Sequence, residues 1–309
     1  MKTHTLFTLL PAVCAALILC TACGGRTSGG KKSVPFERPE VPVMMSPQEK
    51  GVFMTRHYWD KFDFADTVSL WGEKKPAEQI FVDYLAIISQ VDPTEAAHSE
   101  QKMLAAAEAA DSVTFTRFIA LYEKYLHDPN SPMRNEELYI PVLEYIVAST
   151  ALPELEKSRP QHRLNMALKN RQGTQAADFI YTVASGVTGK MHDIRAEYTI
   201  LFFNNPGCTT CKTMREEISA SPLLSEMIRT GQLKILAFYP DEDLTEWRNY
   251  RSNIPSNWIN SYDARQAVRK GDLYDLKAIP TLYLLSRDKT VLIKDAFSPA
   301  QIEQYLQGR

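Results

Sequence analysis

Residues 198–211 read YTILFFNNPGCTTC, and they carry the strongest structural signal in the chain. The first six residues form a short apolar run of the kind found in a buried central strand. Pro206 and Gly207 then end the strand and turn the chain. Cys208 and Cys211 follow directly, where the next segment takes on a helical pattern. The stretch therefore predicts a strand, a turn and a Cys-X-X-Cys pair that opens a helix.

The place of this cysteine pair has a chemical meaning. At a helix N-terminus, unpaired N–H groups and the helix dipole favour a thiolate, so we expect Cys208 to be the exposed nucleophile. A three-residue offset along the helix brings Cys211 close to it. From there the second thiol can attack a mixed disulfide and release the partner. Cys208 and Cys211 are therefore the predicted catalytic residues, with Cys211 as the resolving thiol.

The sequence around the pair alternates between strands and helices. Residues 176–183 suggest a strand, and Gly186 and Gly189 mark a turn after it. The further expected elements are a helix over 212–228, a strand over 233–239, a helix over 244–250, a hairpin of 281–285 with 291–293 across residues 287–289, and a final helix from Ser298 to residue 307. This order predicts an α/β domain over residues 173–309, with a central mixed sheet flanked by helices.

Residues 46–172 have a helical pattern and predict a separate all-α domain of five or six helices. The expected start signals are Ser46-Pro47, Asp92-Pro93 and Ser112, and later helices are expected over 136–149 and 163–171. Pro141 implies a start or a kink within the first of these two. The histidines of this region are isolated and lack metal-ligand spacing; they are His57, His98, His127 and His162.

The first residues have the pattern of an export signal. Lys2 precedes an apolar stretch over residues 6–19, which is short for a membrane span. Ala22-Cys23 then resembles the lipobox of bacterial lipoproteins, which implies a signal peptide over 1–22 and a lipid on Cys23. Cys20 stands where that pattern usually has Leu, and an ordinary signal peptide with a chance cysteine is the alternative. Residues 23–45 are rich in Gly, Ser, Pro and Lys and predict a flexible tether.

Composition narrows the chemistry further. Of the 5 cysteines, only Cys208 and Cys211 remain after export and lipidation, so we expect no disulfide framework beyond that pair. A structural zinc site would need two more ligands, and His192 is the one histidine of this domain. We therefore expect no metal and no cofactor other than the redox-active disulfide. A net charge of -2 without a long basic run argues against nucleic acid as a partner.

Ala278-Ile279-Pro280-Thr281 resembles the cis-proline loop of the thioredoxin superfamily. That resemblance implies a cis Ile279–Pro280 bond facing the cysteines, with Ile279 in contact with the substrate. Residues 173–309 resemble periplasmic thioredoxin-like lipoproteins of the TlpA/ResA type. Residues 46–172, with His57-Tyr58-Trp59-Asp60, resemble the helical accessory domain of Bacteroidetes-type lipoproteins.

Two positions depart from the family pattern. Gly207 stands where the family usually has Trp, which removes a flat apolar contact and could admit bulkier substrates, so Gly207 joins Ile279 and Pro280 as a candidate substrate-binding residue. Phe202 stands where thioredoxin carries a buried Asp that assists the resolving thiol. The candidates to replace that acid are Glu216, Glu217, Asp241 and Glu242.

These features predict a membrane-anchored, extracytoplasmic thiol–disulfide oxidoreductase that acts as a reductant or isomerase towards exported proteins. Its expected place is the periplasmic side of a bacterial membrane, with the outer membrane favoured over the inner one and the lipid as the only membrane contact. A DsbD-like membrane protein is the expected electron donor. The alternative is an interaction protein, in which the thioredoxin module is a scaffold with a static disulfide.

Replacing Cys23 with Ser tests the predicted anchor. Stable attachment needs more than one acyl chain, as on a lipoprotein. We expect the Cys23→Ser variant to leave the membrane fraction for the soluble fraction on centrifugation. If the variant still partitions fully with membranes, the anchor is not at Cys23.

Overall fold

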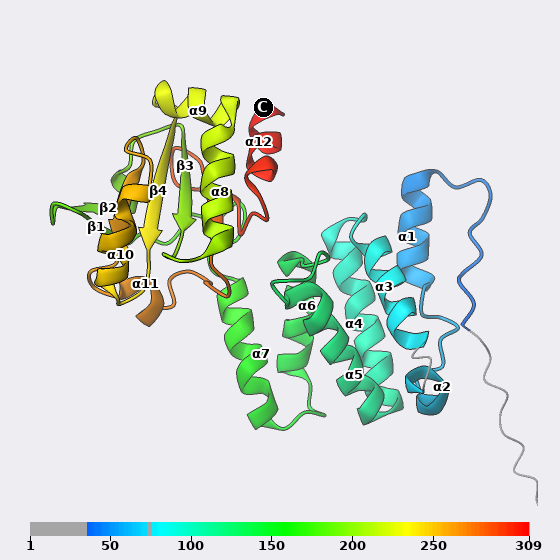
Figure 1. The fold of residues 1–309 in the computed structure, drawn as a ribbon. Coiled ribbons are helices and arrows are strands. Elements are labelled where there is room, and N and C mark those ends of the chain that lie inside the picture. Colours follow the sequence, from blue (N-terminus) through cyan, green and yellow to red (C-terminus); the bar gives the residue numbers. More distant parts are fainter. Residues whose placement is uncertain (1–35, 73–75, 309) are drawn as a thin grey trace, which may run out of the picture. The chain divides into compact units, whose positions relative to one another are not determined.

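The structure, a computed structural model, describes residues 36–72 and 76–308 (Figure 1). The described residues belong to one compact unit. The predicted signal peptide and Cys23 lie outside the described residues. Within the two described ranges, each helix is too short or too polar to span a membrane.

The first half of the described chain is helical, as the sequence predicts. Its elements are α1 (Pro47–His57), α2 (Thr67–Trp71), α3 (Pro76–Ile88), α4 (Pro93–Ala110), α5 (Ser112–Tyr122) with a π-helical turn over Glu123–His127, α6 (Glu136–Ala148) and α7 (Glu154–Ala167). We refer to residues 36–172 as the helical region.

Two of the three helix starts expected from the sequence are confirmed. Ser46 caps α1 in a capping box with Glu49, and Asp92 caps α4 by accepting a 2.8 Å hydrogen bond from the Thr94 N–H. The third is off by one residue, because Asp111 caps α5 and Ser112 is its first residue. A carboxylate can accept from two N–H groups at once, and Asp111 accepts from both Val113 and Thr114.

Two prolines of this region lie inside helices and do not mark helix limits. Of the start or kink expected at Pro141, the start is wrong, because α6 runs through that residue. Helix α7 begins at Glu154, before the expected residue 163, runs through Pro160 and ends at Ala167. Proline removes one N–H, and the burial of apolar neighbours such as Ile140 and Val142 outweighs that loss in α6.

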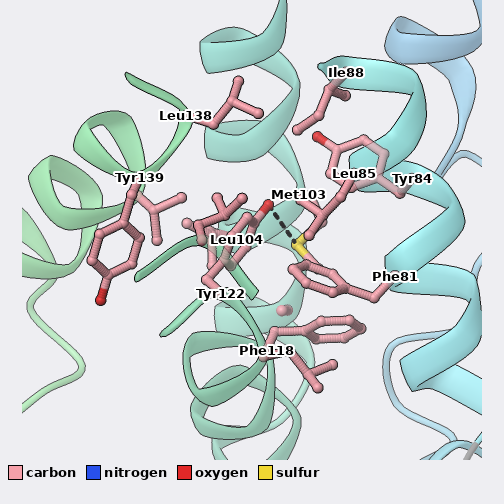
Figure 2. Packing of buried hydrophobic residues seen from close by; sticks show 14 of the residues in the cluster. Phe81, Tyr84, Leu85, Ile88, Met103, Leu104, Phe118, Tyr122, Leu138 and Tyr139 are labelled. Atoms are coloured by element: carbon pink, nitrogen blue, oxygen red, sulfur yellow. Dashed lines mark hydrogen bonds between the residues drawn. The ribbon is translucent and has the colours of Figure 1, made fainter. Parts of the chain in front are cut away.

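Aromatic side chains form the core of the helical region (Figure 2). The rings of Phe81 and Tyr122 meet edge to face, 4.7 Å between centroids, and the Tyr122 hydroxyl lies 3.9 Å from the Met103 sulfur. Phe36, from the segment predicted as a flexible tether, packs 5.2 Å from the ring of Tyr58. The packed part of the helical region therefore begins before α1.

The second half contains one seven-stranded sheet with the order β2-β1-β5-β4-β3-β6-β7. The strands are β1 (Ile180–Val183), β2 (Thr188–Lys190), β3 (Tyr198–Phe203), β4 (Leu233–Tyr239), β5 (Ile259–Tyr262), β6 (Thr281–Leu285) and β7 (Val291–Ile293). Strands β3, β4 and β5 are parallel neighbours and the other pairs are antiparallel. The fold class is confirmed: a mixed sheet with flanking helices follows an all-α region.

Alternate residues of β3 face two separate cores. Ile200 and Phe202 pack with helix α8 (Thr209–Ala220), α9 (Pro222–Arg229) and α12 (Pro299–Gln307). Leu201 and Phe203 pack on the other side, with residues such as Phe179 and Tyr274. Successive side chains of a strand point to opposite faces, so a strand covered on both faces must be apolar throughout. This is why the run in β3 is continuous, and β3 and β4 lie side by side in the middle of the sheet (Figure 1).

Three expectations for this domain need correction. Residues 176–179 precede β1 and are not part of a strand. The expected helix over 212–228 is two helices, because Ser221 caps α9 and Pro222 opens it. Strand β5 was not expected from the sequence, because only four residues, with Asn260 and Ser261 at their centre, form it.

A buried acid lies in the helical region. Glu100 of α4 has no exposed surface, and among the residues that the structure describes neither of its carboxyl oxygens has a hydrogen-bond partner. Burial in this aromatic surrounding raises the pKa of Glu100 well above its ordinary value. The carboxyl group is therefore protonated where an exposed glutamate would be ionised.

Glu100 should make stability depend on pH. In the unfolded chain the Glu100 carboxyl group loses its proton at about pH 4.3, whereas in the folded chain it retains the proton. The free energy of unfolding therefore falls as the pH rises from about 4.3 towards the pKa of Glu100 in the folded protein. We expect Glu100→Gln to flatten this slope and to gain on the wild type about 1.4 kcal/mol for each pH unit over which Glu100 keeps its proton in the folded protein alone. Urea unfolding followed by circular dichroism at several pH values measures the free energy of unfolding and its slope with pH.

Glu108→Gln is the matched control on the same helix. Hydrogen bonds from Ser149 and Tyr145 lower the pKa of Glu108, so its contribution to stability is lost only as the pH falls. This variant should keep the wild-type slope at neutral and alkaline pH. An unchanged slope in Glu100→Gln would show that Glu100 is ionised in the folded protein.

Candidate functional site

A tight turn joins β3 to α8 and places the first cysteine. The Asn204 N–H donates to the Phe238 carbonyl at 3.0 Å, which extends the pairing of β3 with β4 by one residue. The Cys208 N–H donates to the Asn205 carbonyl, and Gly207 has a φ of +75°. Pro206 at the second position and a positive φ at the third are the features of a type II turn. Glycine at 207 therefore meets a backbone requirement that Trp would not.

Cys208 and Cys211 form a disulfide, with 5.2 Å between their Cα atoms. Cys208 is the N-cap of α8, and its sulfur accepts a 3.1 Å hydrogen bond from the Cys211 N–H. Cys208 is half-buried, whereas Cys211, one turn into the helix, is only 2% exposed. The two sulfurs thus differ in access and in contact with the helix N-terminus, as the sequence predicts.

The loop before β6 lies against the first cysteine. The Ile279–Pro280 peptide bond is cis, as predicted. The Ile279 carbonyl oxygen lies 3.6 Å from the Cys208 sulfur. A disulfide sulfur has no hydrogen to donate, so this is a contact in the present oxidised state and a hydrogen bond only once Cys208 is a thiol. Cys208, Ile279 and Pro280 are thus brought together, while Gly207 is exposed at the turn beside them.

The surroundings of Cys211 are apolar. Phe202 lies in the same buried cluster as Cys211, and its ring is 6.0 Å from that of Trp258. Of the candidate acids, Glu216 and Glu242 are exposed and lie beside Lys or Arg side chains. Among the described residues no hydrogen bond or ion pair links any of the candidate acids to Cys211.

Asp241 has a different part in the site. Its carboxylate forms an ion pair with Arg269 at 2.6 Å and accepts a hydrogen bond from the Asn205 side chain. Asn205 is the first residue of the turn that carries Cys208, and Asp241 follows β4. This contact ties the turn to the loop after the neighbouring strand, 36 residues away. The sequence singled out Asp241 but not its partner.

A cluster of half-buried charges lies next to the loop that carries Ile279. Lys277 forms ion pairs with Glu136 of α6 at 3.1 Å and with Asp275 at 3.0 Å. Burial alone would lower the pKa of Lys277, but these two carboxylates outweigh it and raise the pKa above its ordinary value. Lys294 forms a second ion pair with Glu136. Sequence analysis missed this cluster, because Glu136 and Lys277 are 141 residues apart.

The histidines and the acids of the described residues do not gather into a metal site: no group of three or more His, Cys, Asp or Glu side chains could hold an ion there. The His192 ring nitrogen Nε2 lies 2.7 Å from the Ala176 carbonyl. His127 stacks on Tyr139, and burial lowers its pKa to about 4. Both side chains have structural contacts.

Comparison with known proteins matches each half of the chain. Residues 20–170 match a family described as a domain of unknown function, DUF5106. The crystal structure of a thioredoxin-like protein from Bacteroides caccae is 44% identical, with a TM-score of 0.86, and the match covers 89% of this chain and 99% of that one. The chain belongs to the thioredoxin-like proteins. Because that match spans both regions, this thioredoxin-like protein shares its two-part architecture with the crystal structure.

Other solved structures match less than half of this thioredoxin-like protein. The C-terminal domain of an uncharacterized protein from Bacteroides fragilis is 48% identical, covering 45% of this chain and 98% of that one, with a TM-score of 0.44. The thioredoxin domain of a thiol-disulfide oxidoreductase from Bacteroides vulgatus is 15% identical, covering 44% and 97%, with a TM-score of 0.38. Comparison with curated proteins finds no match.

Gly207→Ala tests the turn that places Cys208. A Cβ at Gly207 would meet no atom within 4 Å, so the substitution acts through the backbone alone. Holding alanine at a positive φ costs about 1 kcal/mol, and we expect the urea midpoint of the oxidised protein to fall accordingly. Gly308→Ala is the control, because Gly308 has a φ of -83° and only ordinary contacts. Equal stability of both variants with the wild type would contradict the strained turn.

Proposed function

We propose that this thioredoxin-like protein is an extracytoplasmic thiol–disulfide oxidoreductase, with Cys208 as the attacking thiol and Cys211 as the resolving thiol. The observation that carries the proposal is the asymmetry of the pair. Cys208 is half-buried, and its sulfur caps α8 and touches the Ile279 carbonyl, whereas Cys211 is buried. The Cys208 sulfur can therefore react with a substrate, whereas the Cys211 sulfur can react only with Cys208.

The reduced protein would act in two steps. The Cys208 thiolate attacks one sulfur of a substrate disulfide; a new S–S bond joins them, and the other substrate sulfur leaves as a thiolate and takes up a proton. The Cys211 thiol gives up its proton and attacks the Cys208 sulfur, which restores the disulfide and releases the first substrate sulfur as a thiol. Two electrons pass to the substrate, with one proton from Cys211 and one from water, and a dithiol donor must then reduce the Cys208–Cys211 disulfide again.

The local geometry supports the first step. The hydrogen bond from the Cys211 N–H to the Cys208 sulfur, at 3.1 Å, stabilises negative charge on that sulfur. The twelve-residue helix α8 adds the positive end of its dipole at the same place. Each of these interactions strengthens as charge develops on Cys208 when the disulfide is reduced.

The setting of the reaction is part of the proposal. Ala22-Cys23 supports a lipoprotein of the TlpA/ResA type, held on the periplasmic side of a bacterial membrane. Its substrates would be exported proteins with disulfides or thiols, and a DsbD-like membrane protein would supply the electrons. Ile279, Pro280 and Gly207 would form the surface that such a polypeptide meets first.

Exchange of single cysteines tests the roles of the two thiols. We expect Cys208→Ser to abolish exchange and Cys211→Ser to accumulate mixed disulfides, because the attacking thiol remains and the resolving one is lost. In the reduced wild type, iodoacetamide should label Cys208 about tenfold or more faster than Cys211 at neutral pH. Peptide mapping by mass spectrometry measures both rates.

A Cys208→Ser, Cys211→Ser double variant sets the background for both measurements. Faster labelling of Cys211 at every pH would reverse the assigned roles. A pair that neither reduces nor reoxidises with any dithiol would support the interaction protein with a static disulfide instead.

A further inference from the structure

The segment that carries Ile279 lacks regular backbone support. We call residues 274–280, between α11 (Ala267–Lys270) and β6, the docking loop. Within residues 36–72 and 76–308, no backbone–backbone hydrogen bond joins residues 274–280 to the rest of the protein. A segment without such bonds opens at low free energy unless its side chains hold it. The position of Ile279 beside Cys208 therefore depends on side-chain contacts of the docking loop.

Several side chains anchor the docking loop, and two of them reach distant parts of the chain. The Tyr274 hydroxyl donates to the Ala177 carbonyl at 2.6 Å, at the start of the loop. Lys277, only two residues before Ile279, reaches Glu136 of the helical region and Asp275. The side chains of Lys277, Glu136 and Asp275 are 15%, 19% and 14% exposed, so solvent screens these charges weakly.

The helical region presents Glu136 in a fixed position. Glu136 is the first residue of α6, next to the N-cap Asn135, whose side chain accepts from the Leu138 N–H at 3.2 Å. Lys294 pairs with Glu136, and its ammonium group also donates to the carbonyls of Ala167 and Lys169, at the end of α7. Lys294 thus links the end of α7 to Glu136 at the start of α6, and the Glu136 carboxylate holds Lys277.

Leu276 and Ile279 of the docking loop also pack against the apolar cores, so the ion pairs of Lys277 add to this apolar support. A cavity of about 570 Å³ adjoins the cluster, and Glu136, Lys277 and Lys294 are among its lining residues. Space beside the loop leaves Lys277 free to move once its partner is removed. Because Lys277 is held by two carboxylates, it is a structural cation and not a free charge for a substrate.

We propose that Glu136 is a positioning residue for thiol–disulfide exchange: through Lys277, the helical region holds the docking loop against Cys208 and so determines how well a polypeptide substrate docks. This inference rests on the proposed exchange reaction. It gives the helical region a role in substrate recognition. A small disulfide needs only the Cys208 sulfur, whereas a polypeptide must also lie along the loop at Ile279, so the two substrates should respond differently.

The experiment compares two substrates in three variants of the full chain. Reduced wild type, Glu136→Gln, Lys277→Met and Glu137→Gln are each assayed with insulin and with glutathione disulfide. Glu137 is the matched control, because it is the next residue of α6 and pairs with Arg171 instead of the loop. Lys277→Met retains the aliphatic stem, so it provides a second variant should Glu136→Gln fold poorly.

We expect kcat/KM for insulin to fall about tenfold in Glu136→Gln and in Lys277→Met, mainly through a higher KM, because a displaced loop misaligns the bound polypeptide. Rates with glutathione disulfide should stay within about twofold of the wild type, and Glu137→Gln should be unchanged with both substrates.

Each other result has a definite meaning. Insulin kinetics of Glu136→Gln equal to those of Glu137→Gln would overturn the positioning role. An equal loss with both substrates would also overturn it, because the effect would then lie in the sulfur chemistry or in overall folding. A wild type that reduces neither substrate would refute the exchange reaction itself, which is a distinct outcome.

Discussion

Burial of β3 on both faces is the constraint on which the rest of the structure depends. Its register with β4 and β6 fixes where the strand ends, and the turn at Pro206-Gly207 begins there. That turn leaves Cys208 at the first N–H groups of α8 and puts Cys211 one turn deeper, in the core. Because β6 pairs with the other edge of β3, the loop before β6 must end beside the same turn. The pairing of the strands thus brings the disulfide and Ile279 together, independently of side-chain contacts.

Glu136 and Glu100, both in the helical region, have different surroundings in the fold. Glu136 forms ion pairs with two lysines of the second half, and these hold its side chain in place. Glu100 has no partner among the described residues, so burial favours its neutral form. A charge removed from water without a partner is unfavourable enough to change its protonation, whereas a paired one is held in place. The first glutamate therefore joins two regions, and the second makes the helical core sensitive to pH.

Each half of the protein has its own hydrophobic core, and charged groups are prominent where the two halves meet. Ion pairs are directional, so they specify one arrangement more sharply than apolar packing of the same area would. The Bacteroides caccae protein has the same two-part arrangement over 89% of this chain. A helical region that holds the docking loop would affect how polypeptide substrates bind. The reaction of the two sulfurs would depend on the thioredoxin-like fold.

The sequence by itself determined the elements that depend on local signals. The bounds of β3, β4, β6 and β7 follow from short apolar runs, and the Cys-X-X-Cys pair after β3 is visible as a local motif. Local reasoning failed where tertiary burial competes with it, as at Pro141 inside α6, and where a strand is as short and polar as β5. Only the tertiary structure decided which charges meet. Glu136 and Lys277 are far apart in the chain, and a salt bridge has no sequence signature, because its energy depends on the distance between side chains and on their burial.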